Sequence, residues 1–202
     1  MYSPMCRLAR YILSILFIVL SYSSCVSSQA GTATRFLVIP PRGRINAEVT
    51  IYQFSDFQCS YCREGARVLG ELNKEFPNRL KVYFKHLPLP QHSQAVTASK
   101  AALAAGLQGK FWEMHDSLFE NQGRLSEQTY LETATALGLD VKRFNQDRKS
   151  EQLDTLLAAD YAHAKSLRIT GTPTFVINGR VVRGYQRIET FREILNANLG
   201  KK

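Results

Sequence analysis

The chain has 202 residues, of which 45% are hydrophobic and 21% charged, and its 26 basic and 17 acidic residues give a formal net charge of +9. This composition is typical of a globular protein and excludes a disordered, collagen-like or disulfide-dense chain. The basic residues are scattered and form no tract interleaved with aromatic residues, so no nucleic acid is expected as a partner.

Segment 1–30 has the pattern of a secretory signal peptide. Arg7 and Arg10 supply a basic start, and an apolar run and a polar stretch of small residues follow. The apolar run is about ten residues long, whereas a membrane-spanning helix needs about twenty. We therefore expect cleavage after residue 30, which places residues 31–202 in the periplasm or another extracytoplasmic space. Two alternatives stay open: lipid attachment at Cys25 and an uncleaved anchor.

The mature chain contains no repeat or flexible linker and is interpreted as one domain. Residues 34–39 predict a short first strand, and residues 49–54 predict a second one that is rich in β-branched and aromatic residues. The apolar positions of residues 60–76 recur on one helical face, and Pro77 ends that helix. Residues 80–87 predict a further strand. Strand, helix and strand in this order are typical of a βαβ unit with a parallel pair.

The second part of the chain predicts a long helical segment followed by a hairpin. Residues from about 90 to 168 carry almost no strand pattern, so an all-helical insertion is expected there. Residues 174–177 and 180–182 flank the Asn178–Gly179 pair, which suits a two-residue hairpin turn, and residues 188–199 predict a closing helix. The predicted fold class is α/β, with β-α-β and β-β-α halves separated by the insertion.

Only two cysteines would stay in the chain after cleavage, Cys59 and Cys62. These cysteines are three positions apart, and a disulfide that closes so short a loop constrains little of the unfolded chain. The pair therefore indicates chemistry rather than a structural disulfide. Unpaired N–H groups and the macrodipole at the helix start favour a thiolate on Cys59, and Cys62 lies one turn later on the same side. A structural zinc site needs four ligands, and the four histidines lack the spacing for one. A redox-active pair is therefore expected rather than a structural metal site.

The motif and its surroundings resemble the thioredoxin superfamily, in which a strand, the Cys59–Cys62 motif, a helix and a Thr172–Pro173 pair occur in this order. The helical insertion, together with residues 54–59 (Phe-Ser-Asp-Phe-Gln-Cys) and 109–115 (Gly-Lys-Phe-Trp-Glu-Met-His), is similar to the DsbA-like thiol:disulfide oxidoreductases. The similarity covers residues 47–199. It implies that Pro173 is cis and lies against the sulfur of Cys59, and that the backbone of Thr172 pairs with a client peptide as an added strand.

Three positions near the cysteines differ from the family pattern. Ser60 stands where the family often has Pro, and Tyr61 stands where the strongest oxidants have His, which predicts a less acidic Cys59 and a less oxidising enzyme. Many relatives also carry a buried Glu six residues before the nucleophile, paired with a Lys, and this group takes part in moving the proton of the second cysteine. That position is Gln53 here, whereas Lys85 matches the Lys. The second cysteine is therefore expected to use water, Lys85 or another route.

Other residues near the motif are expected to be structural. Asp56 on the loop before the helix is interpreted as a turn residue, with a role as proton carrier as the alternative. The aromatic residues and two of the histidines are expected to pack or hydrogen-bond within the fold: Phe54, Phe57, Phe111, Trp112, His86 and His115.

These features together predict an exported thiol:disulfide oxidoreductase that forms disulfides in secreted or periplasmic proteins by exchange at Cys59-Ser60-Tyr61-Cys62. The resemblance implies cysteine-containing client proteins, a membrane redox partner that reoxidises the enzyme, and no cofactor besides the Cys59–Cys62 disulfide. A monomer is expected. Two alternatives stay open. One is a disulfide reductase or isomerase, and the other is a non-catalytic protein that binds a soft metal through the two cysteines.

Overall fold

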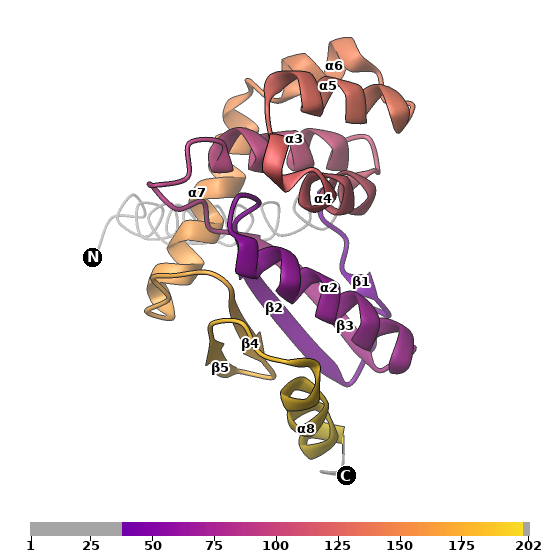
Figure 1. Cartoon of the computed structure of the whole chain (residues 1–202), viewed down its shortest axis with the longest axis vertical. Coiled ribbons are helices and arrows are strands. Elements are labelled where there is room, and N and C mark those ends of the chain that lie inside the picture. The colour runs from indigo at the N-terminus through magenta and orange to yellow at the C-terminus, as the bar shows by residue number, and fades with distance from the viewer. Residues whose placement is uncertain (1–37, 200–202) are drawn as a thin grey trace, which may run out of the picture. The chain divides into compact units, whose positions relative to one another are not determined.

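The computed structural model describes residues 38–199, and the predicted signal segment with Cys25 lies outside them. A five-stranded sheet with the order β1-β3-β2-β4-β5 forms its centre (Figure 1). β2 and β3 are parallel, and the other neighbouring strands are antiparallel. The strands are β1 (Arg42–Gly43), β2 (Val49–Ser55), β3 (Leu80–His86), β4 (Thr174–Ile177) and β5 (Arg180–Arg183).

The predicted βαβ unit is confirmed by β2, α2 (Ser60–Glu75) and β3. Along the parallel pair, Val49 lies opposite Leu80 and Phe54 lies opposite Lys85. The N-cap of α2 is Cys59, so the helix begins within the cysteine motif. The cysteine pair is thereby placed where β2 ends and α2 begins, as the sequence pattern predicts.

The predicted strand over residues 34–39 is wrong in its described part. Val38 and Ile39 are buried but pair with no strand, and the edge position of the sheet belongs to β1 instead. The carbonyl group of Val38 packs closely against Gly106. A Cβ atom at position 106 would lie only 2.2 Å from the Val38 oxygen. The indole N–H of Trp112 donates a 2.8 Å hydrogen bond to the carbonyl oxygen of Pro40. Packing against the helical insertion therefore outweighs the strand preference.

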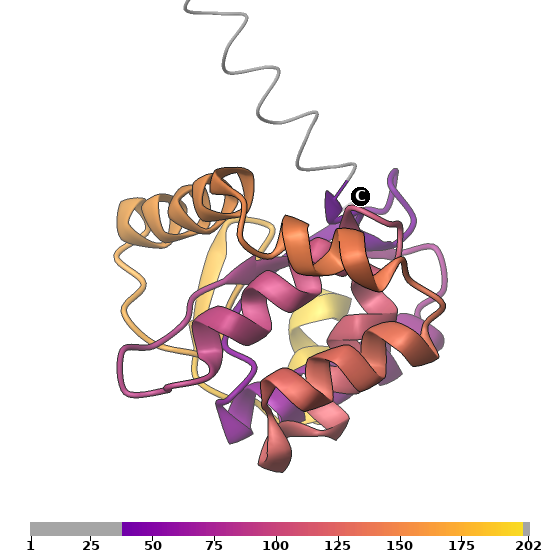
Figure 2. The same cartoon turned by 90° about the horizontal axis from the view of Figure 1, so that it is seen from above.

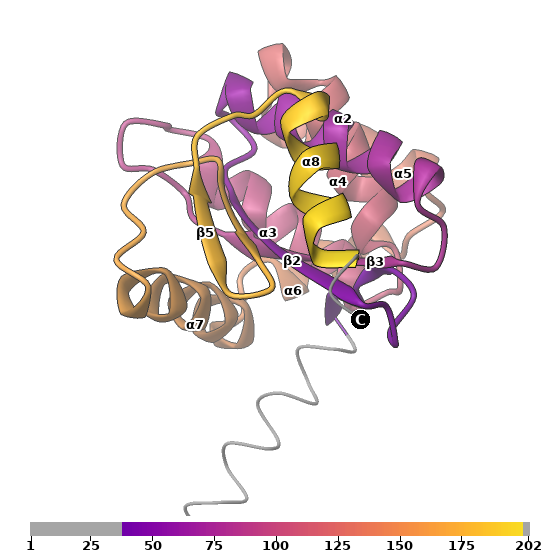
Figure 3. The same ribbon diagram turned by 90° about the horizontal axis from the view of Figure 1, so that it is seen from below.

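Helices cover both faces of the sheet. α2 and α8 (Ile188–Leu199) lie side by side on one face, and α7 (Glu151–Ser166) lies on the other (Figure 3). Because side chains alternate along a strand, the residues of β2 divide between two clusters. Ile51 packs with the apolar side chains of α2 and α8, whereas Phe54 packs with Ala164 of α7.

The predicted all-helical insertion is present between β3 and β4. Its first helices gather at one end of the sheet, which Figure 2 shows from above, and its last helix runs along one face of the sheet (Figure 1). They are α3 (Ala95–Gly106), α4 (Phe111–Glu120), a 3₁₀ turn (Gln122–Arg124), α5 (Glu127–Ala136), α6 (Val141–Asp147) and α7. α3 is rich in alanine and buried, so the neighbouring helices approach it closely. One apolar cluster joins these helices to Phe57, Cys59 and Cys62, so the cysteine motif lies where the insertion meets the sheet.

The predicted hairpin and closing helix are also confirmed. β4 and β5 pair across Asn178 and Gly179, whose φ angles are +46° and +88°. These left-handed conformations match a two-residue turn that follows the strand twist.

Within residues 38–199, none of the helices combines the length and the apolar character that crossing a membrane requires.

Candidate active site

Cys59 and Cys62 are both free thiols at the first turn of α2. Cys59 has extended backbone angles, and its carbonyl oxygen accepts hydrogen bonds from the N–H groups of Cys62 (3.0 Å) and Arg63 (3.3 Å). The exposed fraction is 8% for Cys59 and 0% for Cys62. The first cysteine is therefore the one that a second thiol can reach, and the second cysteine is sealed below it.

The environment of Cys59 favours its thiolate. The hydrogen bond from the Cys62 thiol is the largest of the effects that lower the pKa of Cys59 to about 6, and the hydroxyl of Thr172 and the backbone of Cys62 add to it. Burial and the negative charge of Asp56 oppose this shift. Cys59 is thus substantially ionised at neutral pH, which a thiol nucleophile or leaving group requires.

Cys62 has the opposite behaviour. Burial is the main cause that raises the pKa of Cys62, and the neighbouring Cys59 raises it further. The hydroxyls of Thr172 and Ser55 partly offset this effect. Both hydroxyl oxygens are buried next to the cysteine pair. The reduced pair therefore holds one thiolate and one protonated thiol.

The Thr172–Pro173 peptide bond is cis, as predicted. The thiol of Cys59 lies 3.7 Å from the carbonyl oxygen of Thr172, so the segment before β4 passes directly over the nucleophilic sulfur. The carbonyl oxygen of Pro173 accepts a 2.9 Å hydrogen bond from the N–H of Gly184. The loop is thereby tied to the end of β5, and its role in client binding stays a prediction.

The structure does not bring Lys85 to Gln53. Gln53 lies opposite Phe84 in the parallel register, and its amide nitrogen faces the space left by Gly65 on α2. Lys85 is the next residue along β3, so its side chain is on the other face of the sheet, where its Nζ lies 3.0 Å from an oxygen of Asp160. The expected proton route through Lys85 is not supported by this placement.

Asp56 has the contacts of a turn residue. Its buried carboxylate accepts hydrogen bonds from the N–H groups of Gln58 (2.7 Å) and Leu89 (2.8 Å). The ring nitrogen Nδ1 of His92 lies 2.8 Å from the same carboxylate. Both oxygens thus hold the loop before α2 in place, which matches the turn interpretation.

Two contributors to the site were not predicted. The side-chain amide of Gln122, in the 3₁₀ turn of the insertion, donates hydrogen bonds to the carbonyl oxygens of Phe57 (2.8 Å) and Cys59 (2.9 Å). Ser55 is the last residue of β2, and its buried hydroxyl influences Cys62. No local pattern marks Gln122, whereas Ser55 lies four residues before Cys59 at the end of the predicted strand, a position that could have indicated it.

Ser60 and Tyr61 are both exposed at the start of α2. The ring of Tyr61 stacks on that of Tyr185 with 6.3 Å between centroids.

The predicted structural residues lie in the interior as expected: Phe54, Phe57, Phe111, His86 and His115 are buried, and Trp112 is partly buried. Burial lowers the pKa of His115, whose Nδ1 lies 2.7 Å from an oxygen of Asp116.

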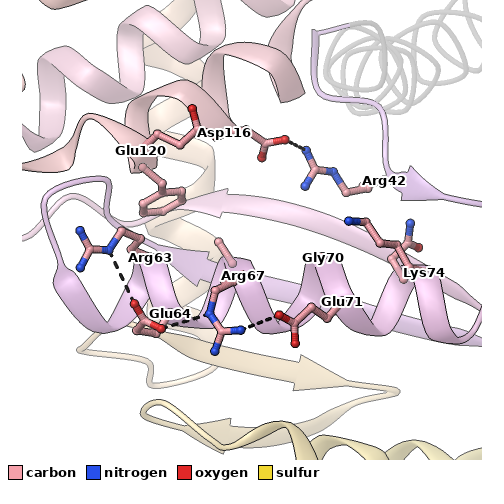
Figure 4. Close-up of a pocket in the computed structure, with 12 residues that line it drawn as sticks. Arg42, Arg63, Glu64, Arg67, Gly70, Glu71, Lys74, Asp116 and Glu120 are labelled. Atoms are coloured by element: carbon pink, nitrogen blue, oxygen red, sulfur yellow. Dashed lines mark hydrogen bonds and ion pairs between the residues drawn. The ribbon is translucent and has the colours of Figure 1, made fainter.

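A groove of about 740 Å³ lies next to the motif, between α2 and α4, and its lining contains neither cysteine. Figure 4 shows most of its charged side chains in pairs, whereas Lys74 and Glu120 have no marked partner there. Arg67 contacts Glu64 and Glu71, and Arg42 lies 2.7 Å from Asp116. These ion pairs make most of the groove a salt-bridged surface beside the site. Across residues 38–199, no cluster of three or more potential metal-ligating side chains occurs.

The site thus combines a cysteine with a lowered pKa at the start of a helix, a buried second cysteine, and the Thr172 carbonyl oxygen 3.7 Å from the first sulfur. This arrangement suits thiol–disulfide exchange. The sequence profile of the family described as thioredoxin matches residues 40–197. The chain therefore belongs to the thioredoxin family, and its fold is that of the DsbA-like thiol:disulfide oxidoreductases, as the resemblance predicts.

Solved structures give the same fold. A thioredoxin-like oxidoreductase from Silicibacter pomeroyi DSS-3 aligns with a TM-score of 0.72 at 26% identity, over 82% of this chain and 94% of that chain. The thiol-disulfide exchange protein alpha-DsbA2 from Wolbachia pipientis aligns with a TM-score of 0.72 at 19% identity, over 88% and 97% of the two chains.

Curated relatives of greater length contain a similar segment. The Na(+)/H(+) antiporter NhaA 1 of Salinispora arenicola (strain CNS-205) is 40% identical over 149 residues, which cover 73% of this chain. The chain spans 23% of the length of that relative. The antiport activity in its name is that of the longer protein.

Proposed function

We propose that the chain is an exported thiol:disulfide oxidoreductase that introduces disulfides into cysteine-containing client proteins. The observation that carries this proposal is the pairing of an accessible Cys59, with its pKa lowered to about 6, and a buried Cys62, with its pKa raised. A stabilised thiolate favours the reduced enzyme over its disulfide. The disulfide form is therefore an oxidant of other thiols.

The reaction follows from the accessibility of the two sulfurs. A client thiolate attacks the sulfur of Cys59 in the Cys59–Cys62 disulfide, the S–S bond breaks, and Cys62 leaves with the electron pair and takes up a proton. A second client thiolate then attacks the client sulfur of the mixed disulfide, and Cys59 leaves as a thiolate. The client loses two electrons and the enzyme gains them, so a membrane redox partner must reoxidise the pair.

The contact at Thr172 supports a mode of client binding. Its carbonyl oxygen lies 3.7 Å from the Cys59 sulfur, at the start of the segment that leads into β4. An extended client that pairs with this backbone as an added strand would bring its cysteine to Cys59.

The cysteine pair is the only redox group that the proposal needs, and no metal or organic cofactor is part of it. We propose that the enzyme acts as a monomer.

The proposed location rests on the basic start, short apolar run and small residues of segment 1–30. Disulfides persist in extracytoplasmic compartments, where an oxidase of this kind has its substrates. Mass spectrometry of the mature protein from an exporting host tests this. An N-terminus at Gly31 supports export by cleavage, an N-terminus at a lipid-modified Cys25 supports anchoring, and an intact Met1 contradicts both.

Oxidation of a peptide with two cysteines tests the proposed activity. The oxidised protein is expected to convert the dithiol peptide to its disulfide, and Cys59→Ser is expected to abolish this reaction. An unchanged rate in that variant would overturn the mechanism. Reduction of insulin disulfides without peptide oxidation would favour the reductase or isomerase alternative, and stoichiometric Cu(I) binding without thiol exchange would favour the metal-binding one.

A further inference from the structure

Two tyrosines meet beside the nucleophile. Tyr61 is two residues after Cys59 in the first turn of α2, and Tyr185 follows the end of β5. Their rings stack with 6.3 Å between centroids and an interplanar angle of 27°. Tyr61 is nevertheless 64% exposed, which makes it one of few large apolar side chains that the described residues leave open to water. Exposed apolar groups that gather at one place are typical of a binding surface.

The stack is fixed to the loop that covers the sulfur. The N–H of Gly184 donates a 2.9 Å hydrogen bond to the carbonyl oxygen of Pro173, and Tyr185 is the next residue. Gly184 has a φ of +76°, a conformation that glycine adopts readily and that lets the chain turn here. Tyr185 is partly buried against the cluster below α2 and α8. The contacts thus run from Cys59 through the Thr172–Pro173 loop to Tyr185 and back through Tyr61.

Two arginines border this aromatic pair. Arg183 and Arg187 flank Tyr185 in the sequence, and both are exposed. Neither forms an ion pair within the described part of the chain, whereas Arg63 on α2 is paired with Glu64 at 3.7 Å. The surface beside Cys59 is therefore aromatic with unneutralised positive charge at its edge. A ligand that complements it carries an apolar ring and carboxylates.

We propose that Tyr61 and Tyr185 form a specificity platform for client segments that carry an aromatic side chain two positions from the reacting cysteine and acidic residues nearby. This inference rests on the proposed function. In a client strand added at Thr172, residues two apart lie on the same face, about 7 Å from one another. When the client cysteine points to Cys59, the side chain two positions away points to the same enzyme surface. A side chain one position away points to the opposite side.

The test uses oxidised full-length protein and single-cysteine peptides, with the rate of mixed-disulfide formation as the readout. The first set of acidic peptides has Phe two residues before and two residues after the cysteine. The second set has Ser at these two positions and Phe at the positions directly next to the cysteine. The platform predicts that the first set reacts about tenfold faster, a ratio within the range expected for burial of one aromatic side chain. A Lys-flanked version of the first set is expected to react more slowly than the Glu-flanked version.

Variants of Tyr185 separate recognition from folding. Tyr185→Phe keeps the ring and is expected to retain the tenfold preference, whereas Tyr185→Ser is expected to lose it. The matched control is Tyr161→Ser, because Tyr161 is also an exposed tyrosine but lies on α7, outside the platform. This variant is expected to keep the preference.

Three results would overturn the platform: equal rates for the two Phe arrangements, equal rates for Glu- and Lys-flanked peptides, or an unchanged preference in Tyr185→Ser. Glutathione carries no aromatic ring, so its exchange rate with the protein measures the proposed function separately from the platform. If the wild-type protein exchanges with glutathione but shows no peptide preference, only the platform fails. If it exchanges with neither glutathione nor peptides, the proposed function itself fails.

Discussion

The side-chain amide of Gln122 donates a 2.9 Å hydrogen bond to the carbonyl oxygen of Cys59, a residue 63 positions earlier in the chain. The same amide group also donates to the carbonyl oxygen of Phe57 at 2.8 Å. One side chain of the insertion thus binds two carbonyl groups of the loop between β2 and α2. The helical insertion is therefore part of the redox site and not merely a cover over the sheet.

Replacing Gln122 tests this connection. Gln122→Ala removes the hydrogen bonds to the carbonyl oxygens of Phe57 and Cys59, and the Cys59 oxygen keeps only those from the helix N–H groups. The free energy of unfolding is therefore expected to fall by about 1–3 kcal/mol. Urea unfolding measures this change, and the rate of Cys59 alkylation is expected to change with it. Gln128→Ala, which removes an exposed amide that contacts only Glu132 on the same helix, is the control. An equal effect of both substitutions would contradict the anchoring role.

The Cys62 thiol is expected to be the main support of the Cys59 thiolate. Cys62→Ala removes this donor, so the pKa of Cys59 should rise well above about 6. Cys62→Ser keeps a hydroxyl donor and should raise the pKa less. The pH dependence of iodoacetamide alkylation gives both values. Both variants should also accumulate mixed disulfides with clients, because the thiol that would resolve them is absent, and failure to trap any client would argue against exchange at Cys59.

The Thr172 hydroxyl is predicted to stabilise the same thiolate. Thr172→Val keeps the shape of the side chain but removes the hydroxyl, so the pKa of Cys59 should rise. Thr172→Ser retains the hydroxyl and serves as the control. Alkylation profiles that coincide for wild type and Thr172→Val would show that the backbone contact alone governs this side of the sulfur.

The stability of the reduced protein should depend on pH through Cys59. Its pKa is about 6 in the folded state against a reference value of 9.0, so between these values the unfolded chain binds more protons than the folded one. The free energy of unfolding should therefore rise with pH from about 6 toward 9, and this contribution should be lost as the pH falls to 6. Urea unfolding of reduced wild type and reduced Cys59→Ser isolates the effect. A difference between them that stays constant with pH would contradict the lowered pKa.

Gly65 leaves the space into which the sheet side chains below α2 fit. A Cβ at this position would lie 2.9 Å from the ring of Phe175, so Gly65→Ala is expected to lower the free energy of unfolding by about 1–3 kcal/mol. Gly70→Ala, on the same helix with nothing within 4 Å, should instead raise it by up to about 1 kcal/mol. Thermal unfolding of the two variants tests the packing, and similar shifts would contradict it.

Features encoded by neighbouring residues could be predicted from the sequence, and features created by long-range packing could not. Alternating and helical patterns were sufficient to place Cys59 between β2 and α2 and to locate the hairpin at Asn178–Gly179. Gln122 and Tyr185 reach the site only through the packing of distant elements, so no local pattern indicated them. Lys85 was matched by its position on the neighbouring strand, but the alternation of β3 turns it to the face of α7.

The reduction potential of the Cys59–Cys62 pair tests the central claim most directly. Equilibration of the protein with defined glutathione mixtures, followed by quantification of its disulfide form, yields this value. If Cys59 is the stabilised thiolate of an oxidase, the potential should lie closer to about −120 mV than to about −270 mV, and the Tyr61 position predicts a value below the strong-oxidant limit. A potential closer to about −270 mV would place the pair among reductants and contradict the proposed direction of electron flow.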